Sequence, residues 1–114
     1  MKEIIAIIRH SQWQKTKAGL AEEGFPSITV QKAFGRGKQK GLRYLSQIGK
    51  SEAGIRLLPR RIVTLCVRDE DAAKVIDILI VINRTGEIGD GKIFVCPLEG
   101  IERLRTGEKG EAAI

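Results

Sequence analysis

Residues 85–95 read Thr-Gly-Glu-Ile-Gly-Asp-Gly-Lys-Ile-Phe-Val. Gly86, Gly91 and Lys92 fit the G-x-x-x-x-G-K core of a P-loop. Ile93, however, stands where that motif has a Ser or Thr that binds Mg²⁺. The segment therefore has phosphate-binding character but lacks the usual metal ligand.

The residues on either side of this loop reverse the order of a P-loop. Apolar residues at helical spacing (72–82) precede it and a β-type run (93–96) follows it, whereas a P-loop leads from strand to helix. The acidic residues 69–71 suit the positive N-terminus of a helix, and a further β-type run (62–67) comes before them. This half of the chain predicts a β-α-β unit.

The first third of the chain predicts a second unit of the same kind. Residues 4–8 are apolar and rich in β-branched side chains, which is typical of a buried strand. Ser11-x-x-Gln14 matches a capping box, and Gly24 is placed to end the helix that would follow. Residues 28–34 then alternate apolar and polar side chains, as a strand does.

Two β-α-β units in tandem predict an α+β, ferredoxin-like domain, a four-stranded antiparallel sheet with both helices on one face. The chain, 1–114, is expected to be one domain. Residues 35–58 contain five glycines and no sustained periodicity, which predicts a long functional loop between the second and third strands. In the C-terminal segment, 98–114, alternation would place Arg103 and Arg105 on one side if the segment is extended.

The predicted strands carry few charges on either face. Two helices cover only one face of such a sheet, so the other would remain open in a single copy. We therefore expect an oligomer in which the second face packs on another subunit.

The composition is that of an ordinary globular chain, with 42% hydrophobic and 30% charged residues among 114. No apolar run approaches the roughly 20 residues of a membrane span, and no signal peptide pattern is present, so a cytoplasmic protein without membrane insertion is expected. Cys66 and Cys96 lack metal-ligand spacing and are predicted to be buried free thiols. A single histidine, His10, excludes sites that need several.

The net charge of +6 belongs to one part of the chain. Residues 35–61 contain eight Lys and Arg against Glu52 alone, so the remainder is close to neutral. Such a cluster suits an anionic partner, which could be nucleic acid, a phosphorylated small molecule or an acidic protein surface. A solvated basic loop is the simpler alternative.

Three separate elements have the chemistry of a phosphate site: the glycine-basic segment 34–41, the loop 86–92, and the pair Arg103 and Arg105. Glycines let backbone N–H groups approach oxygen atoms closely, and Lys and Arg supply neutralising charge. Each element is common in turns or on surfaces, so only their combination is informative.

In this order, the elements resemble the PII family of nitrogen-regulatory signal proteins over essentially the whole chain. The resemblance is carried by Met1-Lys-Glu-Ile-Ile-Ala-Ile-Ile8, Thr29-Val30, Gly37-x-Gln39-Lys40-Gly41, Leu58-Pro59, residues 85–95 and Arg103-x-Arg105-Thr-Gly-Glu108. It implies a homotrimer of ferredoxin-like subunits that has no enzymatic activity and binds ligands in the clefts between neighbours.

The resemblance implies that ATP and ADP compete for each cleft. The residues that would form the nucleotide site are Thr29, Gly35, Gly37, Lys38, Gln39, Cys66, Gly89, Asp90, Gly91, Lys92, Arg103 and Arg105. Gln39 would also coordinate Mg²⁺, which would replace the ligand missing from the loop. The carboxylates of 2-oxoglutarate would lie against Gln39, Lys40, Gly41 and Arg60.

By the same resemblance, ligand occupancy would set the conformation of the basic effector loop, 35–58, which docks on a target protein. Tyr44 lacks the Arg-Gly-x-Glu-Tyr setting of members controlled by uridylylation, so that control is not expected. Residues 34–41, 81–86 and 94–97 look more like the nitrogenase-associated branch. There, two related PII-like proteins assemble and switch off dinitrogenase.

Three alternatives remain open at this point. The first is a general PII regulator of glutamine synthetase, an ammonium channel or a transcription factor. The second is a nucleotide-hydrolysing enzyme, although no His, Cys or paired-carboxylate arrangement is placed to activate water. The third is a nucleic-acid-binding module, suggested by a pI of 9.6. Only Tyr44 could stack on bases in the basic segment, so no nucleic-acid partner is expected.

Overall fold

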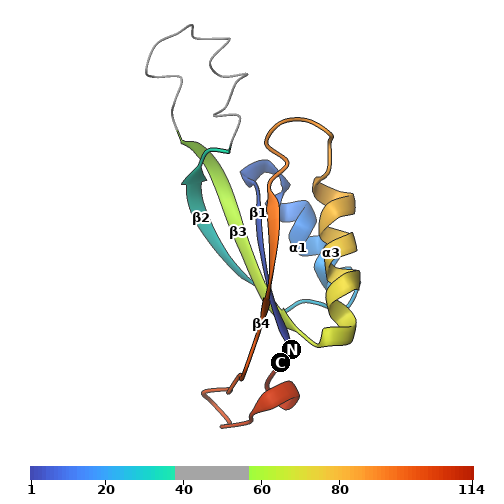
Figure 1. Cartoon of the computed structure of the whole chain (residues 1–114), viewed down its shortest axis with the longest axis vertical. Coiled ribbons are helices and arrows are strands. Elements are labelled where there is room, and N and C mark those ends of the chain that lie inside the picture. The colour runs from blue at the N-terminus through green and yellow to red at the C-terminus, as the bar shows by residue number, and fades with distance from the viewer. Residues whose placement is uncertain (38–56) are drawn as a thin grey trace, which may run out of the picture.

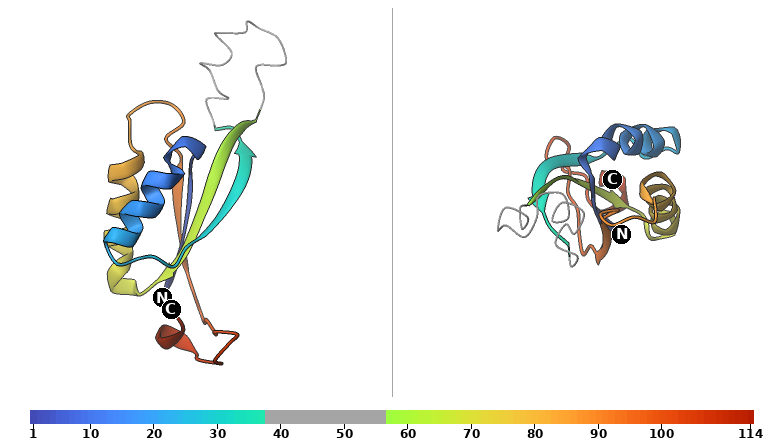
Figure 2. Two further views of the ribbon diagram at one scale, coloured as in Figure 1. Left: turned by 180° about the vertical axis from the view of Figure 1, so that it is seen from behind. Right: turned by 90° about the horizontal axis from the view of Figure 1, so that it is seen from above.

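The computed structural model describes residues 1–37 and 57–114, which form one antiparallel sheet covered on one face by two helices (Figures 1 and 2). The strand order is β2-β3-β1-β4. The elements, in chain order, are β1 (Lys2–Arg9), the 3₁₀ turn η1 (His10–Gln12), α1 (Trp13–Glu22), β2 (Thr29–Gly35), β3 (Leu58–Val67), α3 (Asp69–Asn83), β4 (Lys92–Pro97) and the 3₁₀ turn η3 (Gly110–Ala113). The predicted α+β, double β-α-β arrangement is confirmed.

Two details of the predicted secondary structure are wrong. Ser11 does not cap the first helix, because it lies in η1, and Gln12, the residue before α1, makes no capping side-chain hydrogen bond. The third strand begins at Leu58 rather than at residue 62, with Pro59 paired opposite Phe34. Proline lacks a ladder donor but is tolerated near the beginning of a strand, which explains why it does not terminate the pairing here.

The segment predicted as the effector loop, 35–58, is shorter at both ends than expected. Gly35 is the last residue of β2 and Leu58 the first of β3. Residues 38–56 lie outside the described residues, so the predicted loop is not tested over most of its length.

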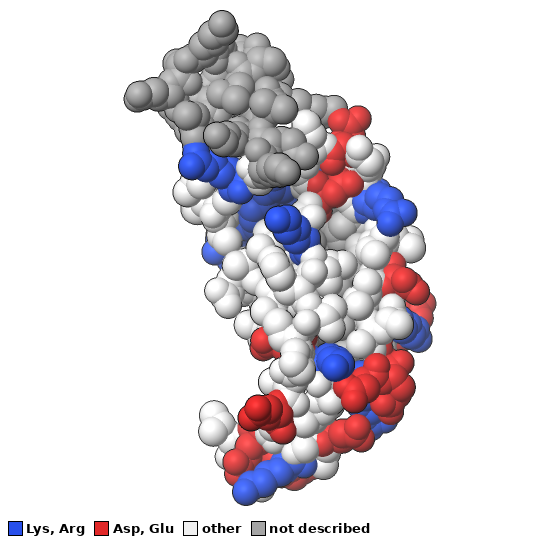
Figure 3. All heavy atoms as spheres, in the orientation of Figure 1, with Lys and Arg blue, Asp and Glu red and all other residues white. Residues whose placement is uncertain are grey.

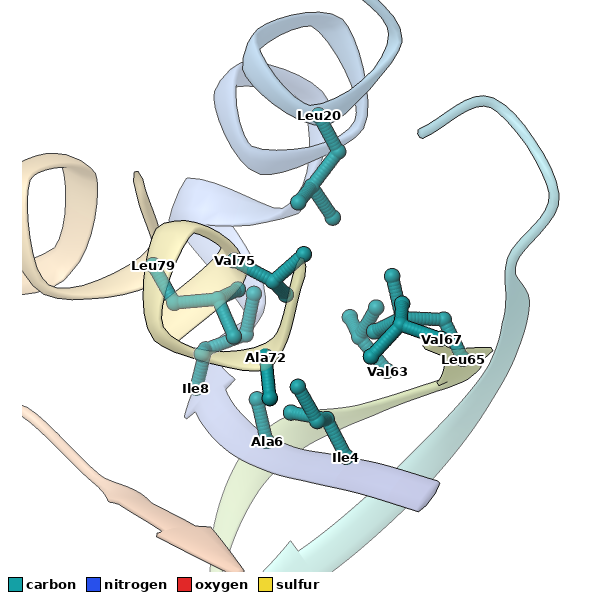
Figure 4. Close-up of a cluster of buried hydrophobic side chains, with 10 residues drawn as sticks. All are labelled: Ile4, Ala6, Ile8, Leu20, Val63, Leu65, Val67, Ala72, Val75 and Leu79. Atoms are coloured by element: carbon teal, nitrogen blue, oxygen red, sulfur yellow. The ribbon is translucent and has the colours of Figure 1, made fainter. Parts of the chain in front are cut away.

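Period-two alternation on the two central strands builds the core (Figure 4). Every second residue is buried against the helices from Ile4 to Ile8 of β1 and from Val63 to Val67 of β3, and α1 and α3 contribute apolar residues from their inner faces. The ten buried apolar residues are Ile4, Ala6, Ile8, Leu20, Val63, Leu65, Val67, Ala72, Val75 and Leu79.

A short polar network joins the two helices inside this apolar layer. Asn83 Nδ2 donates to Thr16 Oγ1 at 3.1 Å and to the Leu79 carbonyl at 3.0 Å, and the Thr16 hydroxyl donates to the Gln12 carbonyl at 2.8 Å. The helices approach so closely that a Cβ on Gly19 would stand 2.4 Å from Ile82 Cδ1. The network and the glycine together fix how α1 lies on α3.

The N-terminus of α3 follows the prediction. Asp69, Glu70 and Asp71 occupy its first turn, where carboxylates interact favourably with the helix dipole. Asp69 also lies 2.9 Å from the N-terminal ammonium group, and this hydrogen bond lowers the pKa of its carboxyl.

The opposite face of the sheet has no covering element among the described residues. Ile5 and Ile7 of β1 and Ile62 of β3 lie there and are only partly buried, because the helices pack on the other face. The sphere view shows a central band without charged side chains (Figure 3). An uncovered apolar face of this kind is consistent with the expected second subunit.

The cysteines depart from the prediction of buried thiols. Cys66 and Cys96 are free but only partly buried, on the uncovered face on either side of Glu3. Burial, followed by the nearby Glu3 carboxylate, raises the pKa of the Cys66 thiol. Within the described residues, no helix is long and apolar enough to cross a membrane.

The packing of α3 gives a stability prediction with an internal control. Leu79 is 1% exposed whereas Val81, two residues along the same helix, is 80% exposed. Leu79→Ala should lower the free energy of unfolding by about 2–5 kcal/mol because it leaves a cavity, and Val81→Ala should change it by less than about 0.5 kcal/mol. Chemical denaturation of both variants measures the difference, and equal losses would contradict this assignment of the core.

Candidate functional site

The P-loop-like segment forms a loop, residues 84–91, that joins the C-terminus of α3 to β4; we call it the glycine loop. It lies at the end of the sheet where β1 finishes and β3 begins (Figure 1). The side chain of Ile93, the residue that breaks the P-loop match, belongs to β4 and packs against the core. The predicted order of helix, loop and strand is confirmed.

The Asp90 carboxylate organises the interior of the glycine loop. It accepts hydrogen bonds from the Thr85 N–H at 2.9 Å, the Gly86 N–H at 3.0 Å and the Thr85 hydroxyl. The Thr85 hydroxyl in turn accepts from the Glu87 N–H at 3.1 Å. The Thr85 hydrogen bonds, reinforced by Arg9 and Gly86, outweigh desolvation and hold the pKa of Asp90 well below its usual range.

Two arginines from the neighbouring strands hold the loop from outside. Arg9, at the end of β1, binds Asp90 Oδ1 through Nη1 at 2.7 Å and donates from Nη2 to the Ile88 carbonyl at 2.9 Å. Arg60 of β3 donates from Nη1 to the Gly89 carbonyl at 2.6 Å. The loop is thus attached to both central strands through side chains far from it in sequence.

Glycine is required at position 91 because the glycine loop lies very close to β1. The φ of Gly91 is +105°, and a Cβ there would stand 1.8 Å from the Ile7 carbonyl oxygen. Gly86 also has a positive φ, +82°, but a Cβ there would meet nothing within 4 Å. Both positions favour glycine through backbone conformation, but only at Gly91 does packing also require it.

The charged side chains at this end of the sheet favour the binding of an anion. The guanidinium groups of Arg9 and Arg60 both lie beside Gly89, with Asp90 as the carboxylate that pairs with one of them. Burial, followed by repulsion from Arg9, lowers the pKa of Arg60. Lys92 adds a further exposed cation at the beginning of β4. Basic side chains gather at this end of the molecule (Figure 3).

The other predicted phosphate ligands lie at the opposite end of the same chain. β4 runs from Lys92 beside the glycine loop to Pro97, and the C-terminal segment containing Arg103 and Arg105 follows it there (Figure 1). Cys66 is next to the last residue of β3 at this end. One copy of the chain therefore does not bring together the loop and these two arginines.

The C-terminal segment is folded back rather than extended. The Arg103 N–H donates to the Glu108 carbonyl at 2.9 Å, and residues 104–106 form a turn. Arg103 also pairs with Glu108 Oε1 at 3.0 Å, while Arg105 is exposed. The condition for that alternation, an extended segment, is therefore not met, because hydrogen bonds of Arg103 with Gly107 and Glu108 close a turn that contains Arg105.

Two cavities mark the two ends. One, of about 370 Å³, lies between α3 and β4 and is bordered by Asp90, Gly91 and Lys92. The other, of about 300 Å³, is bordered by Cys66 and by Ile114 at the chain terminus. Predicted nucleotide residues thus line a cavity at each end.

The remaining predicted residues divide between described and undescribed parts of the chain. Thr29 begins β2, opposite Thr64, and Gly35 ends it, near the Arg60 side chain. Gly37 lies two residues beyond the end of β2. Lys38, Gln39, Lys40 and Gly41 lie outside the described residues. Within the part of the chain that is described, no three His, Cys, Asp or Glu residues come together as a metal site.

Sequence reasoning missed Arg9 and Thr85 as residues of this site. Arg9 directly follows the apolar run that was assigned to a strand, and a cation at a strand end is an ordinary surface feature. Its role depends on the pairing of β1 with both β3 and β4, which brings the end of β1 under the glycine loop. No local signal contains that information.

Comparison with known proteins identifies the class to which this fold and site belong. A family model described as nitrogen regulatory protein P-II matches residues 1–108. The chain belongs to the nitrogen regulatory P-II family, and it is a nitrogen-regulatory signalling protein, as the sequence motifs predicted.

Its relatives include proteins whose names refer to nitrogen fixation. The nitrogen fixation nifHD region glnB-like protein 2 of Methanococcus maripaludis is 45% identical over 123 residues and covers 100% of both chains. The protein of the same description from Methanobacterium ivanovii is 46% identical over 121 residues, covering 100% of this chain and 99% of its own.

A solved structure supports the fold. The crystal structure of Arabidopsis thaliana PII bound to citrate matches with a TM-score of 0.78 at 30% identity, covering 98% of this chain and 87% of that chain.

The two loop glycines give a matched pair of variants. Gly91→Ala should destabilise the protein by roughly 2–4 kcal/mol, because the new methyl group collides with the Ile7 carbonyl and the backbone conformation is strained. Gly86→Ala should lower the free energy of unfolding by only about 1 kcal/mol, because the backbone would be strained but the new methyl group would collide with nothing. Chemical denaturation distinguishes them, and equal costs would show that the loop does not lie against β1.

The lowered pKa of Asp90 predicts a pH dependence. Its folded pKa is depressed, so the stability it contributes is present above the unfolded pKa of about 3.9 and is lost as pH falls through the folded value. Asp90→Asn should therefore be less stable than wild type at pH 7, and the gap should narrow below about pH 4. Denaturation across pH measures the gap, with Asp77→Asn on the exposed side of α3 as the control. A gap that is independent of pH would contradict this role.

Proposed function

We propose that this nitrogen-regulatory protein senses ATP against ADP, together with 2-oxoglutarate, in clefts between its subunits, and that it regulates nitrogenase in the cytoplasm. The observation that carries the proposal is the separation of the phosphate-binding residues. The glycine loop and the arginines Arg103 and Arg105 lie at opposite ends of one chain, so a second copy is needed to complete the site.

The nucleotide phosphates would bind to the glycine loop of one subunit. Gly89 lies beside the guanidinium groups of Arg9 and Arg60, and only Arg9 is paired with a carboxylate, that of Asp90, which leaves excess positive charge for an anion at Gly89, Gly91 and Lys92. Gly35, Gly37, Lys38 and Gln39 would close over the nucleotide from the same subunit. The neighbour would supply Thr29 and the backbone at Cys66 to the adenine, and Arg103 and Arg105 to the phosphates.

The homotrimer that the family resemblance implies would use this head-to-tail contact. When one end of a subunit binds the opposite end of its neighbour, the contact is heterologous, and it forms a closed ring where the rotation between subunits closes. Three copies would give three equivalent clefts, and the uncovered face of each sheet would become buried. The partly buried residues Ile5, Ile7 and Ile62 on that face favour such burial.

2-Oxoglutarate would bind at the segment that follows β2. Gln39 would coordinate Mg²⁺ bound to ATP, and 2-oxoglutarate would lie against Gln39, Lys40, Gly41 and Arg60. Arg60 already donates to the Gly89 carbonyl, so the same guanidinium would contact both the carboxylate ligand and the glycine loop. Binding of the two ligands would then be coupled.

The proposed target rests on the names of the relatives. Several are described as nitrogen fixation nifHD region proteins, which favours dinitrogenase as the target and a second PII-like protein as a partner. Ligand occupancy would shift the population of effector-loop conformations, and the loop would bind or release the enzyme accordingly.

Calorimetry tests the ligands directly. ATP and ADP should bind competitively, and 2-oxoglutarate should bind only with Mg-ATP present. Lys92→Ala should weaken ATP binding by about tenfold or more, since it removes a charge-assisted phosphate contact. Lys17→Ala on α1 is the control. Binding of 2-oxoglutarate to the protein without nucleotide would contradict the shared site.

A mixing experiment tests whether the site is shared between subunits. Lys92→Ala impairs the loop half and Arg105→Ala the other half, so each variant alone should bind ATP weakly. Subunits unfolded together and refolded as mixed rings should recover about one quarter of intact sites, because each site combines two different chains. If mixing restores no ATP binding, both halves of the site would lie in one subunit.

Pull-down from native extract identifies the target. Recovery of dinitrogenase, released by Mg-ATP with 2-oxoglutarate, is expected. Recovery of glutamine synthetase or an ammonium channel instead would favour a general P-II role.

A further inference from the structure

The Arg9–Asp90 ion pair has a place in the proposed nucleotide site that neither motif matching nor the comparisons assign. Asp90 lies between Gly89 and Gly91, the two glycines proposed to hold phosphates, and its carboxylate is negatively charged because its pKa is lowered. A carboxylate facing a phosphate would repel it. The structure instead directs this carboxylate into the loop, toward Thr85 and Gly86.

Arg9 supplies the charged partner of that carboxylate among the described residues. It binds Asp90 Oδ1 at 2.7 Å, and both side chains are 26% exposed, so the pair is shielded more than an ordinary surface ion pair. The other Arg9 nitrogen donates to the Ile88 carbonyl at 2.9 Å. One guanidinium therefore fixes both the carboxylate and the backbone two residues before it.

Arg9 is well placed for this role because its backbone is rigid. It is the last residue of β1, paired with Arg60 on one side, and the preceding residues of β1 pack against Gly91. The loop and the strand end consequently behave as one unit.

We propose that Arg9 is a positioning residue of the nucleotide site, acting through Asp90. By neutralising Asp90 and holding it toward Thr85 and Gly86, Arg9 keeps the phosphate-binding side of the glycine loop free of negative charge. This role rests on the proposed function.

A double-mutant cycle in the full-length protein tests the proposal by calorimetry with Mg-ATP. Arg9→Ala should raise the Kd for ATP about tenfold, because Asp90 loses its charged partner. In an Asp90→Asn background the same substitution should change Kd by less than about twofold, since the neutral amide needs no counter-charge. Arg9→Lys, which keeps the charge, should restore most of the affinity.

Controls separate the possible outcomes. Arg61→Ala removes a neighbouring arginine that lies over Trp13 on the other face, and it should leave Kd unchanged. A tenfold loss on Arg9→Ala that persists with Asp90→Asn, or no rescue by Arg9→Lys, would overturn the positioning role, because Arg9 would then act independently of Asp90. Absence of ATP binding by wild type would instead reject the proposed function itself. If Arg9→Ala fails to fold, Arg9→Gln completes the same cycle.

Discussion

Both helices pack on one face of the sheet, and the rest of the molecule depends on that constraint. Ile4, Ala6 and Ile8 of β1 face Val63 and Leu65 of β3 across the ladder, so burying this stripe against α1 and α3 sets the register of the two central strands. The register in turn places Arg9 opposite Arg60 at one end of the sheet. The other face is left uncovered and available to another subunit.

The loop between α3 and β4 has a sequence close to that of a P-loop but lies in a different architecture. In a P-loop, the hydroxyl that follows the lysine binds metal and a helix N-terminus faces the phosphate. Here that position belongs to a strand whose side chain packs on the core, and charge comes from arginines on adjacent strands. Asp90, which the family resemblance places among the nucleotide-binding residues, accepts hydrogen bonds from Thr85 and Gly86 of its own loop.

Much of the fold could be predicted from periodicity. Alternating residues predicted the strands, and the acidic residues before position 72 predicted the beginning of α3. The errors have particular physical causes. Ser11 has the right spacing for a capping box, but it lies within the 3₁₀ turn η1, which follows β1 and precedes α1. The third strand was expected to begin at residue 62, yet pairing of Pro59 with Phe34 extends β3 back to Leu58. In both places, contacts with a neighbouring element overrode a local preference.

The features of the candidate site also divide into those that the sequence determines and those that depend on the tertiary structure. The sequence by itself determined the alternation, the glycines of the loop, the concentration of positive charge, and the family, because these are properties of residue type and order. Tertiary structure alone decided that Arg9 and Arg60 meet at Gly89, that Asp90 turns inward, and that Arg103 and Arg105 lie at the far end of the chain. Strand pairing determines the first and the third, since it brings together residues more than fifty positions apart and separates others only about ten apart. Asp90 turns inward through hydrogen bonds within its own loop and the ion pair with Arg9.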